Sequence, residues 1–301
     1  MPNPDSPPVV LVTGASSGIG RATALEWASR GAALVLCARS ADALEQVRAR
    51  CEDAGGRAVV ARTDVTNADQ VDAAVRHART TFGRLDIAVS VAGVTSYGTH
   101  VKTSAEAFEQ VVAVNLLGPA NLARSVLAGF REDNHGTLVV VGSLLGRVAV
   151  PGMGAYVASK WGLRGLVRVL QQENRDRPGV RITSVAPGSV RTAIYDRAGS
   201  ASGEGGRAPA PSTSPRRVAR QVVAAASVRP AEHDVDALGG LINKLISTGY
   251  RAAPAAFDRL VGPLWSLSST ESGDGDEGHD TDEVGGGDGD SSEHTPGATT
   301  T

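Results

Sequence analysis

The sequence predicts a doubly wound α/β fold, in which helices cover both faces of a mostly parallel sheet of six to seven strands in a single domain. From residue 9 to about residue 186, short apolar runs rich in β-branched residues alternate with longer amphipathic stretches. The short runs are apolar throughout, which is typical of strands buried on both faces of a parallel sheet. Apolar residues make up 41% of the 301 residues, so the chain can bury a large core.

The expected elements follow one another in a regular order. The expected strands are 9–13, 33–37, 57–61, 85–89, 137–141 and 180–185. The helices expected between and after them are 18–30, 41–54, 67–82, 104–131, one that opens at Tyr156, and 215–228. The connections between strands are long enough for the crossovers that parallel neighbours need.

A glycine-rich turn follows the first expected strand at once and opens the first expected helix. Its sequence, at 13–20, is TGASSGIG. Glycine permits the tight turn, the close approach of a phosphate to the backbone, and close packing of helix on strand. The helix N-terminus then offers unpaired N–H groups to an anion. Because strand, turn and helix occur in that order, the segment predicts a dinucleotide site. Its cofactor-binding residues are Gly14, Ser16, Ser17, Gly18, Ile19 and Gly20.

The end of the second expected strand indicates which dinucleotide binds. NAD sites usually place a carboxylate there, to bind the ribose 2′-hydroxyl. This chain has Arg39 instead, in the run LCARS. An arginine can pair bidentately with a 2′-phosphate, so NADP(H) is favoured over NAD(H). The alternative is that Arg39 is an ordinary surface arginine.

Tyr156 and Lys160 lie four residues apart at the start of an expected helix, so their side chains share one face. A free tyrosine has a pKa of about 10 and is a poor acid–base catalyst near neutral pH. A neighbouring ammonium favours the phenolate and lowers that pKa towards neutrality. Most Tyr-x-x-x-Lys pairs are surface pairs, so the pair needs further support.

Together these segments resemble the short-chain dehydrogenase/reductase family, which has a Rossmann fold, in its form with a TGxxxGxG turn and a YxxxK active site. The resemblance covers about residues 9–195. Further residues match the family's motifs in the same order. They are Asp64 and Val65 at the adenine, Ala92 and Gly93 after the fourth strand, the helical Asn115, Ser143 before Tyr156, and Pro187, Gly188, Val190 and Thr192 beside the nicotinamide.

The resemblance implies a role for each catalytic residue. Tyr156 donates a proton to the substrate oxygen in reduction and removes it in oxidation. Lys160 lowers the tyrosine pKa and binds the nicotinamide ribose. Ser143 hydrogen-bonds the carbonyl oxygen, and Asn115 holds a water that connects Lys160 to solvent.

One segment departs from the family pattern. After the fourth strand the family usually has Asn-Asn-Ala-Gly, whereas this chain has SVAG at 90–93. The small Ala92 and Gly93 still let a cofactor approach closely. Val91 lacks the amide that normally braces the central sheet, so we expect a weaker brace there but unchanged proton chemistry.

The chain after Thr192 is expected to cover the substrate. Residues 197–215 are rich in Gly, Ala, Ser and Pro, which predicts a flexible lid. Tyr195, Tyr97 and Met153 are candidates to line the substrate pocket, with ordinary packing as the alternative.

The C-terminal part predicts two further regions. Residues 231–266 are expected to be a helical extension of the domain at 9–230. This extension contains an apolar stripe formed by Leu238, Leu241, Ile242, Leu245 and Ile246. Such a stripe is typical of core or of a subunit contact, with a membrane-surface helix as the alternative. Residues 267–301 carry ten acidic residues and no Lys or Arg. They are expected to be a disordered acidic tail. The alternative is that this tail folds onto a basic surface or recruits a partner. Residues 1–8 are expected to be a flexible N-terminus.

The function expected from these features is an NADP(H)-dependent oxidoreductase that acts on a small carbonyl or alcohol. The alternative is a dinucleotide-binding sensor on the same fold. By resemblance we expect a homodimer or homotetramer that assembles through the helices containing Asn115 and Tyr156. We expect a cytoplasmic location, because the N-terminus does not look like a signal peptide and only two cysteines are present. The sequence contains no run of 18 or more consecutive apolar residues, so it predicts no membrane-spanning helix. Scattered charges and few aromatics argue against nucleic-acid binding, and the histidines and cysteines show no metal-ligand spacing.

Overall fold

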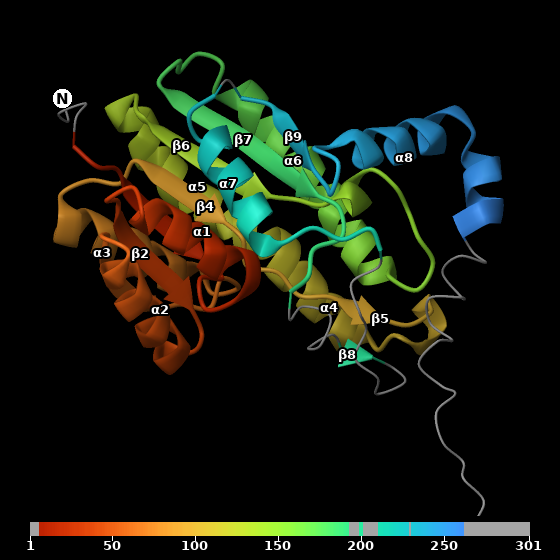
Figure 1. The fold of residues 1–301 in the computed structure, drawn as a ribbon, viewed down its shortest axis with the longest axis horizontal. Helices are drawn as coiled ribbons and strands as arrows, with labels where there is room; N and C mark the ends of the chain where they lie inside the picture. The colour runs from red at the N-terminus through yellow and green to blue at the C-terminus, as the bar shows by residue number, and fades with distance from the viewer. Residues whose placement is uncertain (1–5, 193–198, 201–209, 229, 262–301) are drawn as a thin grey trace, which may run out of the picture.

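A computed structural model of the chain describes residues 6–192, 199–200, 210–228 and 230–261. Its centre is a seven-stranded sheet in which all recorded pairings are parallel, with the strand order β3-β2-β1-β4-β6-β7-β9 (Figure 1). The predicted doubly wound fold is confirmed. The strands are β1 Val9–Thr13, β2 Ala33–Ala38, β3 Arg57–Arg62, β4 Ile87–Ser90, β6 Gly136–Val141, β7 Val180–Pro187 and β9 Glu232–Val235.

Helices cover both faces of this sheet. One core cluster joins α1, α2 and α7 to one face, and the other joins α3, α5 and α6 to the opposite face. Alternate residues of β1 face the two clusters, because side chains alternate along a strand. The strand order reverses between β1 and β4, which is where α/β sheets open a ligand crevice. The helices are α1 Gly18–Ala28, α2 Ala41–Asp53, α3 Ala68–Phe82, α4 Ala105–Val112, α5 Gly118–Asp133, α6 Gly154–Glu173, α7 Pro215–Ala225 and α8 Leu241–Ala252.

The helix expected at 104–131 is interrupted. It divides into α4 and α5 around a π-helical turn, Ala113–Leu117. π-turns often occur at functional sites, and this one contains Asn115. By length and composition the stretch Ala105–Asp133 resembles a membrane-spanning helix. Half of its most apolar 18-residue segment is buried in the fold, however, as in the core helix of a globular domain.

The seventh strand, β9, extends the sheet beyond the boundary that the sequence predicted at residue 230. It pairs with β7, with Ser184 opposite Glu232 and Pro187 opposite Val235. Its sequence, EHDV, lacks the apolar run that indicated the other strands. Ion pairs to Arg147 and Arg164 satisfy its carboxylates instead.

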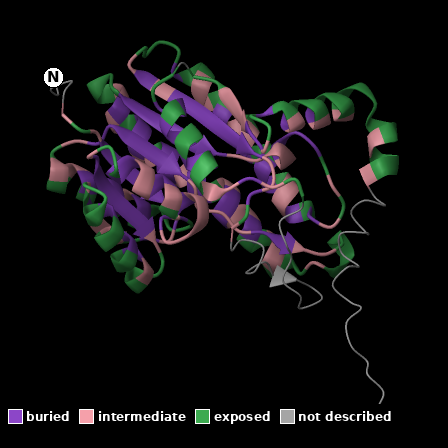
Figure 2. Ribbon diagram, viewed as in Figure 1, coloured by how far each residue is buried: buried purple, intermediate pink, exposed green. Residues whose placement is uncertain are grey.

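The leucines of the apolar stripe at 238–246 face outward in the structure, whereas Ile242 and Ile246 are partly buried, so the stripe is not core as a whole. The alternative, a subunit contact, stays a prediction. Leu238, Leu241 and Leu245 are all more than half exposed, and Figure 2 shows α8 as largely exposed. The buried residues of α8 are Asn243 and Ser247. Polar contacts to the sheet, rather than leucine packing, therefore orient this helix.

Parts of the expected terminal and lid regions lie outside the described residues. These are residues 1–5, the tail at 267–301, and most of the lid. Within the lid, β8 (Gly199–Ser200) pairs with β5 (Ser96–Tyr97), and Thr213 forms a bridge with Val190. The two ends of the lid segment therefore contact the chain around the pocket described below.

Candidate active site

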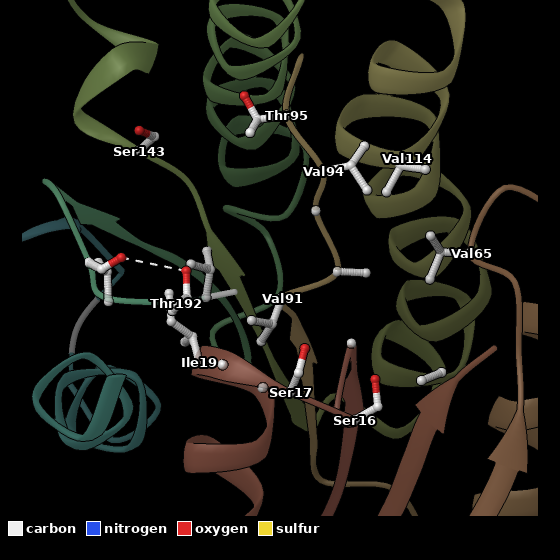
Figure 3. A pocket seen from close by; sticks show the side chains of 18 of the residues that line it. Ser16, Ser17, Ile19, Val65, Val91, Val94, Thr95, Val114, Ser143 and Thr192 are labelled. Atoms are coloured by element: carbon white, nitrogen blue, oxygen red, sulfur yellow. Dashed lines mark hydrogen bonds between the residues drawn. The ribbon is translucent and has the colours of Figure 1, made fainter. Parts of the chain in front are cut away.

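A pocket with a volume of about 430 Å³ lies where the strands of the sheet end. Its walls come from the turns that follow β1, β2, β3, β4, β6 and β7, together with α6. In Figure 3, Ser16 and Ser17 lie at one end of the pocket, Ser143 and Thr95 at the other, and Val91 between them. The pocket therefore lies at the carboxyl ends of these strands, which is where doubly wound sheets bind their ligands.

The glycine-rich turn after β1 forms one wall of the pocket and is packed without spare room. Gly14 has φ +67°, and a Cβ there would lie 2.8 Å from Ala92 Cα. A Cβ on Gly20 would overlap the carbonyl of Gly14. These contacts give the physical reason for the glycines that the sequence analysis singled out. They hold α1 so close to β1 and β4 that its first turn faces the pocket.

The first turn of α1 is suited to an anion. Its N-cap, Ser17, makes no side-chain capping bond, so the Ser17 hydroxyl does not satisfy the first N–H groups of the helix. Positive charge lies in the same pocket, since Arg39, after β2, and Lys160, on α6, both line it. A dinucleotide, with a pyrophosphate in its middle, fits this distribution of donors.

Asp64, which follows β3, is the carboxylate that lines the pocket. It accepts hydrogen bonds from the backbone N–H and the hydroxyl of Thr66, at 2.9 and 2.8 Å. The backbone bond, aided by the hydroxyl and by the charge of Arg39, holds the pKa of Asp64 below its ordinary value despite partial burial. Its own N–H donates to Gln70 Oε1 at 2.8 Å. Asp64 is therefore a fixed, ionised wall of the pocket.

Tyr156 and Lys160 lie in the first two turns of α6, and both line the pocket. Lys160 Nζ lies 5.6 Å from the centre of the Tyr156 ring and donates to the carbonyl of Val141 at 3.3 Å. Lys160 is only 6% exposed. Burial lowers the pKa of its ammonium to about 8. The pair predicted from the YxxxK spacing therefore faces the pocket rather than the surface.

Asn115 lies behind the pocket rather than in its wall, and it is fully buried. Its side chain accepts from the N–H of Val94 at 2.9 Å and donates to the carbonyl of Val94 at 2.8 Å. It also donates to Ser159 Oγ at 3.1 Å, and Ser159 donates to the carbonyl of Tyr156. Asn115 thus connects the loop that follows β4 to the helix with Tyr156. The water relay expected for Asn115 stays a prediction.

Ser143 lines the pocket at the end away from Ser16 and Ser17 (Figure 3). It precedes a short 3-10 helix, Leu144–Gly146, and its Oγ accepts the N–H of Leu145 at 3.1 Å. Because that bond uses an acceptor site of the hydroxyl, it leaves the hydroxyl hydrogen to donate. Arg147, which ends the 3-10 helix, lies 2.8 Å from Asp234 of β9. The turn with Ser143 is therefore anchored to the edge of the sheet.

The departure at Val91 is compensated by Thr13 at the end of β1. The hydroxyl of Thr13 accepts from the N–H groups of Val91 and Ala92, at 3.1 and 3.4 Å. It also donates to the carbonyl of Val89 at 3.4 Å. The side chain of Val91 packs against the core. The chain after β4 is therefore tied to β1 without the amide, a brace that the sequence analysis did not anticipate.

The structure brings nearly all of the predicted site residues together in this one pocket. The exceptions are Asn115, behind it, and Tyr97 and Met153, which are not in its wall. Tyr195 lies outside the described residues. Other wall residues were not predicted from the sequence, although each ends a strand, lies in the turn after one, or lies on a flanking helix. These are Ala38, Ser40, Thr63, Val91, Val94, Thr95, Val114, Val141 and Gly142.

Comparisons with known proteins agree with this geometry. A family model described as short chain dehydrogenase matches residues 8–202. The glycine betaine reductase ATRR of Emericella nidulans is 38% identical over 63% of this chain and 15% of its own length. Human dehydrogenase/reductase SDR family member 7 is 35% identical over 62% of this chain and 57% of its own length. The chain thus spans only part of these two relatives.

A solved structure is also similar to this one. It is an alcohol dehydrogenase from the archaeon Thermococcus sibiricus, complexed with 5-hydroxy-NADP. The two chains are 30% identical and superpose with a TM-score of 0.67, over 77% of this chain and 97% of the archaeal chain. The similarity therefore extends over about three quarters of this chain and nearly all of the archaeal one.

Proposed function

Since this chain belongs to the short-chain dehydrogenase/reductase family, we propose that it is an NADP(H)-dependent oxidoreductase that interconverts a small carbonyl compound and its alcohol, with Tyr156 as the proton donor and acceptor. One observation carries the proposal. Tyr156, Lys160 and Ser143 line the same pocket as the glycine-rich turn of α1. A proton-transferring set and a dinucleotide cradle are thus combined in one crevice.

The donors in the pocket define the proposed cofactor site. The N–H groups of the first turn of α1 would hold the pyrophosphate, and the turn after β7, with Val190 and Thr192, would hold the nicotinamide end. Bound NADP(H) supplies or accepts the hydride. The protein orients the cofactor and moves the proton.

The proton chemistry belongs to three side chains. In reduction, the hydroxyl of Tyr156 gives its proton to the substrate oxygen, and the hydroxyl of Ser143 donates a hydrogen bond to the same oxygen. Lys160, held near the Tyr156 ring, favours the phenolate that remains. In oxidation the same groups act in reverse order.

Arg39 supports NADP(H) over NAD(H). It is exposed, lines the pocket, and directly follows β2, where an NAD site usually has a carboxylate. Its guanidinium can form two parallel bonds to a 2′-phosphate. The complex of the similar archaeal dehydrogenase with an NADP derivative agrees with this preference.

Assembly into a homodimer or homotetramer is part of the proposal. Large apolar side chains are exposed at Leu117, next to Asn115, and at Trp161 and Val169, on the helix with Tyr156. These are the helices through which the family resemblance predicts subunit contacts. Light scattering of the purified full chain would test this, with a monomer at all concentrations as the contradicting result.

The test of the function separates an enzyme from a sensor. We expect the chain to bind NADPH more tightly than NADH and to oxidise NADPH in the presence of at least some members of a broad panel of ketones and aldehydes. A sensor on this fold would bind NADPH without oxidising it with any member of the panel in either direction. Tight binding of neither dinucleotide would contradict the cofactor site itself.

A further inference from the structure

The segment after β9 contacts the end of β7 and the turn that follows it, which lines the pocket. Asp236, only 3% exposed, accepts backbone N–H bonds from Leu238, Gly240 and Asn243 at 2.7, 2.9 and 2.8 Å. These bonds fix the first turn of α8 to the end of β9. The orientation of α8 is therefore set by a buried carboxylate, which explains why its leucines face outward.

This orientation places the side chain of Asn243 beside the pocket wall. Asn243 is 1% exposed, and its Nδ2 donates to the carbonyl of Ala186 at 2.9 Å. Its Oδ1 has no hydrogen-bond partner among the described residues. A Cβ on Gly188 would lie 2.8 Å from this oxygen. The amide of Asn243 thus holds the carbonyl of Ala186 and fills the space beside Gly188.

The turn that Asn243 touches is part of the proposed cofactor site. Pro187, Gly188, Val190 and Thr192 all line the pocket. On the opposite side, this turn meets the phosphate-binding turn, since a Cβ on Gly18 would lie 3.3 Å from Thr192 Cγ2. The turn after β7 is therefore clamped between the start of α1 and α8.

We propose that Asn243 is a positioning residue for the nicotinamide end of the cofactor site, acting through its contacts with Ala186 and Gly188. This inference rests on the proposed NADP(H) function. Asn243 belongs to a segment that lies after β9 and contacts the turn after β7. The adenosine end, with Arg39 and Asp64, follows β2 and β3 on the other side of the point where the strand order reverses. Loss of Asn243 therefore weakens one end of the site selectively.

The experiment compares Asn243→Ala with Ser247→Ala in the full chain. Ser247 is the matched control, because it is buried on the same face of α8 and donates only to the carbonyl of Lys244 in its own helix. The ligands are NADPH and 2′,5′-ADP, which occupies only the adenosine end. We expect Asn243→Ala to raise the Kd for NADPH by roughly five- to 100-fold, the effect of removing a donor from a buried carbonyl. The Kd for 2′,5′-ADP should change less than about twofold, and Ser247→Ala should leave both values unchanged.

A second pair of variants tests the contact itself. Gly188→Ala adds the Cβ that would collide with Asn243 Oδ1, so it should raise the Kd for NADPH. In the Asn243→Ala background the added methyl has room, so the same change should cost at least about threefold less. Equal effects in both backgrounds would overturn the proposal.

The remaining outcomes are equally decisive. An equal rise of both Kd values in Asn243→Ala, or no rise in either, overturns the positioning role. If the parent oxidises NADPH with a carbonyl and Asn243→Ala binds NADPH as well as the parent does, the positioning role fails and the proposed function stands. A parent that binds neither NADPH nor 2′,5′-ADP removes both proposals.

Discussion

Lys160 Nζ lies 5.6 Å from the centre of the Tyr156 ring, in a position where the lysine is almost completely buried. The carbonyl of Val141 accepts its hydrogen bond, and no carboxylate among the described residues forms an ion pair with it. The ammonium is therefore held at a cost to stability, close to the phenol ring of Tyr156.

This cost predicts a pH-dependent stability. Burial lowers the pKa of Lys160 from 10.5 to about 8. Between these two values the unfolded chain keeps the proton that the folded chain has released, so this residue makes the free energy of unfolding rise with pH. The gap corresponds to about 3 kcal/mol. We expect urea unfolding to show that Lys160→Met gains stability over the parent at neutral pH and loses this advantage as the pH approaches 10.5.

The comparison with Lys160→Met is needed because two thiols act in the opposite direction. Burial raises the pKa of Cys37 to about 12 and that of Cys51 to about 11. Above pH 9 the unfolded chain loses these protons first, so both thiols make stability fall with pH. Their effect is common to parent and variant. An advantage of Lys160→Met that stays constant over the whole range would contradict the lowered pKa of Lys160.

Arg39 predicts a change of cofactor preference. Without its guanidinium, the 2′-phosphate loses a charged hydrogen-bond pair worth about 1.5–3 kcal/mol. We expect Arg39→Ala to raise the Kd for NADPH by roughly 10- to 100-fold and to change the Kd for NADH little. Fluorescence titration of both cofactors measures this. Equal losses for NADPH and NADH would mean that Arg39 does not contact the 2′-phosphate.

Arg147 predicts an effect on stability at the edge of the sheet. Its side chain and that of Asp234 are 8% and 9% exposed and lie 2.8 Å apart. Arg147→Met would leave the carboxylate buried without its partner, and we expect a loss of about 3–5 kcal/mol in urea unfolding. Arg147→Met with Asp234→Leu should recover much of that loss, since neither charge is then buried alone. A single variant as stable as the parent would rule out this pair as the anchor of β9.

Glycine-to-alanine substitution should have opposite effects at one glycine that lines the pocket and at another that does not. Gly20→Ala places a Cβ against the carbonyl of Gly14, so the turn must open, and the Kd for NADPH should rise at least about tenfold. Gly165→Ala, in α6, meets no atom within 4 Å. It should leave NADPH binding unchanged and stabilise the helix by up to about 1 kcal/mol. Thermal unfolding and NADPH titration of both variants decide this.

The strands and the main site were predictable because their signals are local. An apolar run marks each of the six predicted strands, and the turn at 13–20 and the Tyr156–Lys160 spacing lie within a few residues of chain. β9 was not predictable in this way. Its carboxylates, Glu232 and Asp234, tolerate partial burial because Arg147, more than eighty residues earlier, neutralises them.

The orientation of α8 was also hidden from the sequence. Periodicity shows that a helix has an apolar face, but it does not show which face packs against the protein. Here the buried carboxylate of Asp236 fixes the first turn, and Asn243 faces the sheet in place of Leu241 and Leu245. The brace from Thr13 to Val91 depends in the same way on geometry that forms only when β1 and β4 pair.

The most direct test of the central claim is the rate of NADPH oxidation by Tyr156→Phe relative to the parent, with a carbonyl that the parent reduces. The phenylalanine keeps the ring beside Lys160 but has no proton to give. We predict a rate at least about 100-fold lower, the usual contribution of a general acid, with the Kd for NADPH within about twofold of the parent. A variant that binds NADPH and reduces the carbonyl as fast as the parent would show that Tyr156 is not the proton donor.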